Sequence, residues 1–380
     1  MELLNLQNTL LYAKAKIVKA NGTNIGLTED VGPVNLFLPS LFHQVDVSLN
    51  GKTVVSTTNH YGYKSYIQCL LRNGREAKET QLSAMLWKQD DEGDMDEHSP
   101  RTGTNNALLY RAKYFEGGKV CDMIGPLFHD LFKMDRYLLN QINVNVKLYR
   151  SKPTFCLFSG DANPDYRVSF EDIRLRVCKV KVNPAVIYAQ SKALETANAK
   201  YPFTQTSVKQ MVISSGATSF TYDNIFQGMR PNQVVVGFVK STGVTGDYEE
   251  NPWFFQGYDV TNIALYVDRN CVGGNPFKPK YGTDTQTISV LRSMLQSTGK
   301  WLDDGGSNIQ RDDINQGYAL YTFDLEPKFR GSQYLTLLKQ GNVRLEVTFG
   351  TALTDTVSCL LYAEFQNCFE VNAARDILIP

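Results

Sequence analysis

The chain has 380 residues, of which 42% are hydrophobic, and its 39 basic and 39 acidic residues give a formal net charge of +0. This length allows two or three domains, and the balanced charge argues against a dedicated nucleic-acid binder, whose affinity rests on excess positive charge. We expect neither a membrane span nor a signal peptide, because the chain has no apolar run of roughly 18 residues and no basic N-terminal region.

The first half of the chain is expected to fold mainly as β-strands. Apolar residues alternate over 11–17 and again over 45–49, where Asn50 and Gly51 follow and predict a hairpin with a two-residue turn. The other predicted elements of this half are helices over 63–72 and 77–87 and strands over 108–115, 120–132, 142–148, 154–158 and 167–182.

The last of these strands, 167–182, is unusually long, and its apolar phase changes twice. A slip of one residue turns every later side chain to the other face of a sheet. We therefore expect β-bulges, or a bend between two sheets, near Glu171-Asp172 and near Cys178.

Two stretches differ from the strands in composition. Residues 88–106 are polar, acidic and rich in Gly, Ser and Thr, which predicts an exposed loop. Residues 184–200 begin with Pro184 at a first helical position and continue with helix-forming residues, which predicts a helical linker. The predicted domains are therefore 1–183, the linker 184–200, and 201–380.

The second half repeats the first in the same order. Residues 238–243 (FVKSTG) resemble 17–22 (IVKANG), and apolar residues alternate over 263–267 as they do over 45–49. A predicted helix over 285–295 takes the place of 63–72, and a closing strand ends each half. Because the second hairpin has Asp268-Arg269-Asn270 in place of Asn-Gly, we expect its turn to be longer or differently shaped. The shared order predicts two tandem copies of one β unit.

The predicted fold class is all-β: two tandem eight-stranded antiparallel jelly-roll sandwiches with short inserted helices. The helices are few and do not alternate with strands, so a doubly wound parallel sheet is excluded. About eight strands with long loops suit a jelly roll better than an up-and-down barrel. An immunoglobulin-type sandwich needs only about 100 residues, fewer than each unit has.

No catalytic, cofactor-binding or metal-binding residue is predicted. The acidic cluster 90–97 fails as an EF-hand, because counting back from Gly93 puts Lys88 at position 1, and we interpret it as a solvated loop. The histidines are dispersed and form no H-x-x-H or H-E-x-x-H pattern. They are His43, His60, His98 and His129.

The seven cysteines form no C-x-x-C pair, and we expect buried free thiols in a reducing compartment. A thiol hydrolase is compatible with a cysteine and a distant histidine, but nothing links a particular pair. Basic residues follow two predicted strands, and we interpret them as the solvated face of a sandwich rather than as a nucleic-acid site. They are Lys14, Lys16, Lys19, Arg174, Arg176, Lys179 and Lys181.

Five short stretches, taken together, resemble the hexon-like major capsid proteins of Polinton (Maverick) elements and adintoviruses, which have a double jelly roll. The similarity spans nearly the whole chain. The stretches are 41–51 (LFHQVDVSLNG), 223–228 (DNIFQG), 251–255 (NPWFF), 321–325 (YTFDL) and 362–365 (YAEF).

This resemblance implies a structural protein and not an enzyme. A homotrimer would form a pseudo-hexagonal capsomer of an icosahedral shell and would contact neighbouring capsomers, pentons and other minor capsid proteins. The protein would be found in the virion after synthesis in the cytoplasm or nucleus. Candidate loops for towers or contacts between capsomers are 88–106, 243–252 and 273–285.

Two other functions remain open on the sequence. A bicupin-like metal-dependent enzyme also pairs two β-barrels, but it would need clustered histidine and glutamate ligands. A carbohydrate- or receptor-binding β-sandwich could stack sugars on exposed tryptophans, although core packing explains such residues equally well. The three tryptophans are Trp87, Trp253 and Trp301.

Overall fold

The computed structural model describes residues 2–55, 59–91, 93–302, 305–326 and 339–379. The first half contains the strands β1 (Glu2–Lys19), β2 (Val31–Pro33), β3 (Phe42–Leu49), β4 (Lys52–Thr53), β5 (Cys121–Pro126), β6 (Val144–Arg150), β7 (Leu157–Ser159) and β8 (Tyr166–Lys181). Its short helices are α1 (Phe37–Ser40), α2 (Tyr61–Arg72), α3 (Arg75–Glu79), α4 (Asn106–Ala112) and α5 (Pro153–Cys156), with the 3-10 turns η1 (Gln81–Met85), η2 (Glu116–Gly118) and η3 (Asp130–Lys133).

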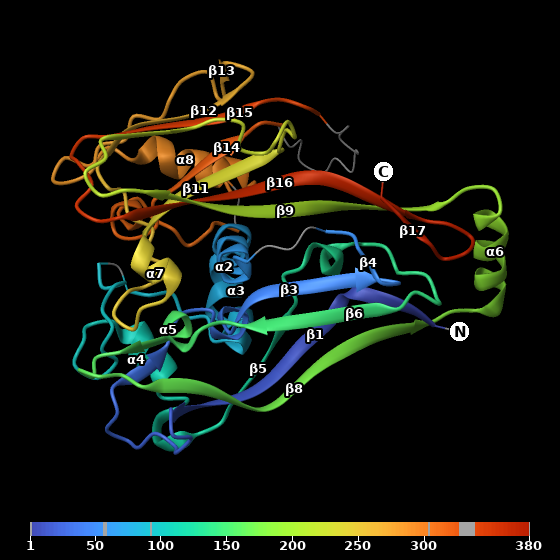
Figure 1. The fold of residues 1–380 in the computed structure, drawn as a ribbon, viewed down its shortest axis with the longest axis horizontal. Helices are drawn as coiled ribbons and strands as arrows, with labels where there is room; N and C mark the ends of the chain where they lie inside the picture. Colours follow the sequence, from blue (N-terminus) through green and yellow to red (C-terminus); the bar gives the residue numbers. More distant parts are fainter. Residues whose placement is uncertain (1, 56–58, 92, 303–304, 327–338, 380) are drawn as a thin grey trace.

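The second half contains β9 (Ala199–Ile213), β10 (Ser219–Tyr222), β11 (Gln233–Lys240), β12 (Val260–Val267), β13 (Asn270–Cys271), β14 (Leu320–Asp324), β15 (Val343–Phe349), β16 (Val357–Val371) and β17 (Ile377–Leu378). Its helices are α7 (Ser241–Thr245), α8 (Ile288–Ser297) and the 3-10 turn η4 (Asp313–Asn315). The helix α6 (Pro184–Leu194) connects β8 to β9 at one end of the molecule (Figure 1).

The sheets of the two halves have matching strand orders. In the first half the main sheets are β5-β1-β8 and β4-β3-β6, beside a two-stranded sheet β2-β7, and in the second half β14-β11-β16 and β13-β12-β15 repeat the arrangement of the main sheets. In the second half β9 also pairs with β16, and β10 also pairs with β15. All these pairings are antiparallel, and the chain has the predicted double-jelly-roll fold with short inserted helices.

The pairing of β3 with β6 matches the pairing of β12 with β15 residue by residue. On β3, Val45, Val47 and Leu49 pair with Leu148, Val146 and Val144 of β6; on β12, Ile263, Leu265 and Val267 pair with Val347, Leu345 and Val343 of β15. Apolar alternation therefore predicted the inner face of both sheets, because side chains on one face of a strand recur every second residue.

The expectation of a longer second turn is wrong. Leu49 pairs with Lys52 in the first hairpin, and Val267 pairs with Asn270 in the second, so each turn has two residues. Asn50 and Gly51 have φ values of 48° and 79°, and Asp268 and Arg269 have 48° and 72°. The twist of paired strands requires positive φ at both turn positions, and in the second hairpin it imposes this conformation on an arginine.

The pairing of the long strand is irregular near both predicted places. The register between β1 and β8 shifts between Lys14 and Ala15, opposite Glu171, and again between Asn5 and Leu10, opposite Val177. Two other local predictions are wrong. Residues 108–115 were expected as a strand but belong mainly to α4, whose N-cap Asn105 accepts a hydrogen bond from the Leu108 amide at 3.1 Å. Residues 77–87 form parts of α3 and η1 in place of one helix.

Helix α2 lies between the two halves (Figure 1). Every residue of this helix except the last, Arg72, is buried. A helix that is buried all round has no solvent-facing stripe, so both halves must supply its partners. Among the described residues, no helix combines the length and apolar character needed to cross a membrane.

Candidate functional site

The two halves meet along a buried seam, which we define as α2, the loop 88–106, Asp130 and the residues of the second half that contact them. Trp253, just before β12, is the largest side chain that is fully buried there. Its ring stacks on Tyr66 with centroids 4.6 Å apart and an angle of 3°, and Tyr63 packs on it edge-on at 5.1 Å. Its indole Nε1 donates a hydrogen bond to the Asn35 carbonyl at 3.0 Å. A second-half tryptophan therefore forms part of the first-half core.

A buried ion pair also belongs to the seam. Lys64 Nζ lies 2.6 Å from Asp130 Oδ1, and these side chains are 3% and 0% exposed. The other carboxylate oxygen, Oδ2, accepts a hydrogen bond from the backbone amide of Thr206 on β9 at 2.8 Å. A buried carboxylate is costly when it loses a hydrogen-bond partner. Because one partner of Asp130 is the Thr206 amide, moving β9 away from the first half would carry that cost.

A chain of hydrogen bonds continues from α2 into β16. Gln68 Nε2 donates to the Tyr362 hydroxyl at 2.9 Å, and that hydroxyl donates to Glu364 Oε1 at 2.6 Å. Arg72, at the end of α2, forms an ion pair with the same carboxylate. Burial, with the nearby Glu364 charge, raises the pKa of Tyr362 well above its usual value, so the hydroxyl keeps the proton that it donates.

The expectation that 88–106 is an exposed, solvated loop is wrong in part. Asp90 is buried in an ion pair with Arg111 of α4 at 2.7 Å, both side chains being 0% exposed. Asp96 Oδ1 accepts a hydrogen bond from the Asn251 amide of the second half at 2.9 Å. Glu92 lies outside the described residues. Asp90 is therefore paired within the first half and Asp96 across the seam, and composition alone could not reveal these partners because they lie elsewhere in the sequence.

His129, next to the seam, is 5% exposed. Burial, aided by the charge of Lys64, lowers its pKa to about 3. In the unfolded chain the His129 imidazole is protonated below about pH 6.5. In the folded protein it stays neutral until the pH falls to about 3. Between these values, protons therefore favour the unfolded chain, and stability falls as pH falls.

We expect the His129 contribution to the free energy of unfolding to be fully present above pH 6.5 and to fall by about 1.4 kcal/mol per pH unit below it. His129→Asn retains a side-chain acceptor for the Leu131 amide, which His129 Nδ1 accepts at 3.4 Å. Urea unfolding at pH 7.5, 6 and 5 should show a shallower pH dependence for this variant than for the native protein. His98→Asn, in the half-buried loop, is the control; equal slopes for H129N and the native protein would contradict the prediction.

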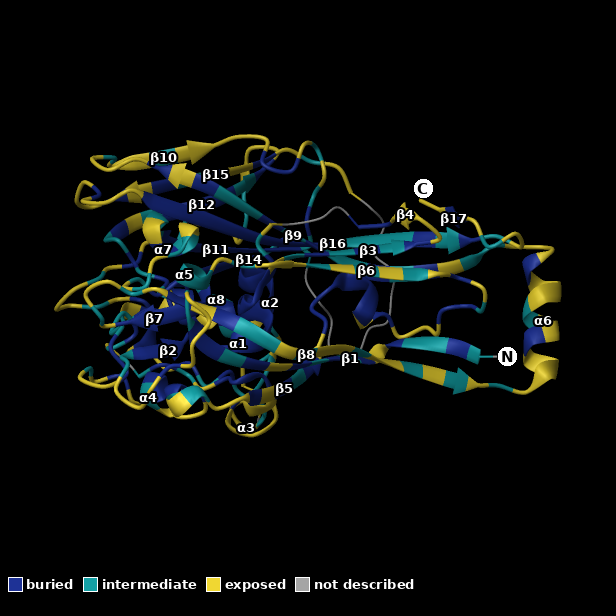
Figure 2. Ribbon diagram, turned by 60° about the horizontal axis from the view of Figure 1, so that its bottom comes forward, coloured by how far each residue is buried: buried dark blue, intermediate teal, exposed yellow. Residues whose placement is uncertain are grey.

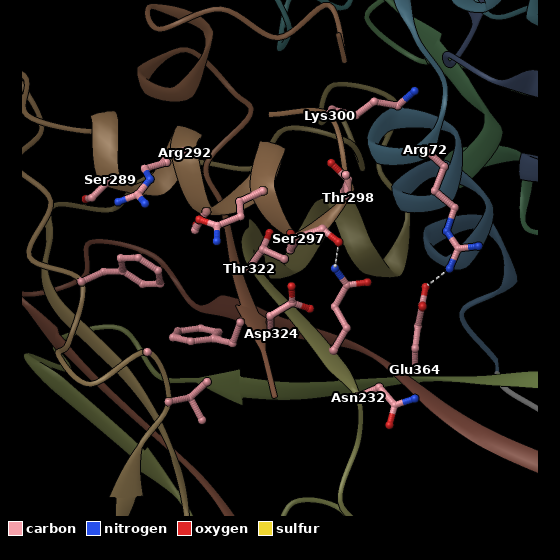
Figure 3. Close-up of a pocket in the computed structure, with 18 of the residues that line it drawn as sticks. Arg72, Asn232, Ser289, Arg292, Ser297, Thr298, Lys300, Thr322, Asp324 and Glu364 are labelled. Atoms are coloured by element: carbon pink, nitrogen blue, oxygen red, sulfur yellow. Dashed lines mark hydrogen bonds and ion pairs between the residues drawn. The ribbon is translucent and has the colours of Figure 1, made fainter. Parts of the chain in front are cut away.

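An open pocket of about 970 Å³ lies on the second half beside α8, and the end of α2 reaches its rim (Figure 3). Gln233 Nε2 donates to the Ser297 carbonyl at 3.1 Å within it. Arg292 and Lys300 add positive charge, and Asp324 adds a carboxylate. The described lining contains serines but no histidine or cysteine, so it pairs no nucleophile with the usual general base.

The residues considered for metal or thiol chemistry are not brought together. In the described ranges, no three His, Cys, Asp or Glu side chains could hold one metal ion, the arrangement that a bicupin-like site needs. All seven cysteines are free. Burial raises the pKa of Cys69 and of Cys156 to about 12, and that of Cys121 to about 11, which opposes the thiolate form that a nucleophile requires.

The tryptophans do not form a sugar platform, because Trp87 and Trp253 are 2% and 0% exposed and only Trp301, at 37%, reaches the surface. Most of the basic residues on β1 and β8 have local partners. Lys16 contacts Glu171 at 2.8 Å, Arg174 contacts Asp172 at 2.9 Å, and Arg176 lies 4.6 Å from the centre of the Tyr12 ring. This is the solvated sandwich face that the sequence indicated.

No protein-family model matches the chain. An uncharacterised protein of Caenorhabditis elegans aligns with 99% of this chain and 90% of its own length at 21% identity.

Solved structures share the fold. A chain from the structure of the Sputnik virophage has a TM-score of 0.59 and 9% identity, with 100% of this chain and 83% of that chain covered. A chain of the PBCV-1 virus capsid has a TM-score of 0.57 and 10% identity, with 100% and 90% covered. At such identities the likeness concerns the double-jelly-roll fold.

Proposed function

We propose that this protein is a major capsid protein whose homotrimers form pseudo-hexagonal capsomers of an icosahedral shell. The observation that carries the proposal is the pair of matching jelly rolls joined through a buried seam. Three copies of a chain with two equivalent units present six units around a three-fold axis, which suits a six-fold lattice position. The similar structures, from the Sputnik virophage and the PBCV-1 virus capsid, support this role.

The seam supplies the rigidity that such a building block needs. If the two jelly rolls could rotate against each other, the angle between the six units of a trimer would not be defined. The Trp253 stack on Tyr66 and the hydrogen bond from the Thr206 amide to Asp130 oppose that rotation, because both join the two halves and are lost when the halves move apart. We propose the boundaries 1–183, 184–200 and 201–380 for the two jelly rolls and their linker. The proposed role is structural and assigns no catalytic residue.

We further propose that the chain belongs with the hexon-like capsid proteins of Polinton elements and adintoviruses. The short stretches that resemble those proteins, among them 251–255 (NPWFF) and 41–51 (LFHQVDVSLNG), support this grouping. The proposed location is the virion, after synthesis in the cytoplasm or nucleus, and the proposed partners are neighbouring capsomers, pentons and other minor capsid proteins. Of the three candidate contact loops, 273–285 is the most exposed and suits such contacts best.

The oligomeric state tests the proposal. Purified protein should give a mass of three chains in native mass spectrometry and sedimentation, and negative-stain images should show particles with a six-sided outline and three-fold symmetry. The measurements should be repeated from low to high salt, because charged contacts between subunits weaken as screening increases. A protein that remains monomeric at high concentration under every salt condition would rule out the trimeric capsomer.

A further inference from the structure

One difference between the two jelly rolls concerns the outer neighbours of their matching strands. In the second half, β9 pairs with β16 over its whole length, and β10 pairs with β15. By strand order, β8 of the first half corresponds to β16, and β6 corresponds to β15. Among the described residues, β8 and β6 each have a partner on one edge only, β1 for β8 and β3 for β6.

The missing neighbours leave core-facing side chains of β6 partly exposed. Val144, Val146 and Leu148 are half-buried, whereas Val343, Leu345 and Val347, the corresponding residues of β15, are 1%, 0% and 2% exposed. The three residues of β6 and the three of β15 are equivalent, because they pair with matching positions of β3 and β12. The difference therefore reflects the absent strand and not the type of residue.

The β8 edge shows the same feature. Ile173 and Leu175 pair with Ala13 and Leu11, which are buried, so their side chains lie on the inner face of the sheet. Yet Ile173 is 42% exposed, and Val177, further along the strand, is 44% exposed. Figure 2 shows intermediate and exposed residues along β6 and β8. Exposed strand edges with aliphatic side chains are templates for added strands.

The outer face of β8 indicates which kind of strand fits. Arg174, Arg176, Lys179 and Lys181 lie along it. The side chains of Arg174 and Lys179 are 72% and 59% exposed despite their contacts with Asp172 and Glu2. Side chains directly opposite each other on paired strands interact, and like charges there are destabilising. If β8 paired with β8 of a second copy, the basic side chains of the two strands would lie side by side and repel each other. A strand with acidic residues on its outer face would instead neutralise the basic side chains of β8.

We propose that the open edge of β8 binds an extended segment of a partner polypeptide, with aliphatic side chains facing the core and acidic side chains facing outward. The segment adds to the sheet of β8 as β9 adds to the sheet of β16 in the second half. The site is closed at one end by Arg150 of β6, which donates a hydrogen bond to the Val168 carbonyl of β8. The inference does not depend on the proposed function, since it rests on the comparison of the two halves.

Labelled peptides test the site directly. The first probe is a peptide with the β9 sequence, 199–213, carrying Lys200→Glu and Lys209→Glu; the second keeps both lysines, and the third is a scrambled form of the first. Fluorescence anisotropy with the full chain should show at least tenfold tighter binding for the first peptide than for either other peptide. Added salt should weaken this binding, because the outer-face contacts are charged.

A matched pair of protein variants locates the binding site. Ile173→Asn combined with Val177→Asn should weaken binding of the acidic peptide at least tenfold. Val186→Asn on α6 is the control, because Val186 is 43% exposed, like the two edge residues, but lies away from the edge. Hydrogen exchange should show new protection in β8 when the acidic peptide binds.

Three results would overturn the proposal. One is equal binding of the acidic and scrambled peptides, and another is protection confined to segments other than β8. The third is self-association without peptide that is lost in the Ile173→Asn, Val177→Asn variant, because a second copy of the chain would then occupy the edge.

Discussion

Trp253→Ala is expected to lower the free energy of unfolding by about 3–5 kcal/mol, the range for removing a fully buried tryptophan. The side chain is 0% exposed. Its loss would leave a cavity between α2 and the second half, where Tyr66, Tyr63 and Phe155 now pack on the indole. Relaxation would be limited, since these rings belong to different elements that are each held by other contacts.

Denaturant unfolding monitored by circular dichroism measures this loss. Trp301→Ala is the matched control, because it removes the same side chain from a position that is 37% exposed. We expect the control to cost much less, since partly exposed atoms regain little water contact on unfolding. The role assigned to Trp253 would be wrong if both variants lost the same stability. Within the proposed function, Trp253→Ala should also reduce trimer formation, because it loosens the two jelly rolls against each other.

Lys64→Met is expected to be comparably damaging, at about 3–5 kcal/mol, although methionine is apolar and of similar length. The change leaves the Asp130 carboxylate, which is 0% exposed, without its cation. The remaining hydrogen bond from the Thr206 amide cannot balance a full buried charge. The loss of stability therefore comes mainly from leaving the Asp130 carboxylate buried without a cation, and not only from losing its attraction to Lys64.

A second variant separates these two causes. Lys64→Met with Asp130→Asn removes the charge but keeps an oxygen that can accept from the Thr206 amide, and we expect it to recover at least half of the lost stability. Arg75→Met is the control for the loss of an exposed ion pair, because Arg75 and Glu79 are 72% and 53% exposed. It should change stability by less than about 1 kcal/mol. If the double variant were no more stable than Lys64→Met, charge burial would not be the cause.

The sequence by itself determined the strands and their repetition. The alternation at Val45 to Leu49 and at Ile263 to Val267 predicted which residues face each core, because the two-residue period of a strand is a local property. The phase changes along β8 predicted both irregularities of its pairing for the same reason. The order of these local signals was sufficient to predict two tandem jelly rolls, which the strand orders confirm.

The tertiary structure alone decided how the halves are joined and where they differ. Nothing in the sequence marks Asp130, Asp96 and Trp253 as contacts between the halves, because their partners Thr206, Asn251 and Tyr66 lie 76, 155 and 187 positions away. Long-range pairing also decided that Arg269 adopts positive φ, since strand twist and not its own preference sets the turn. The open edges of β8 and β6 could not be predicted, because whether a strand has a neighbour depends on the rest of the fold.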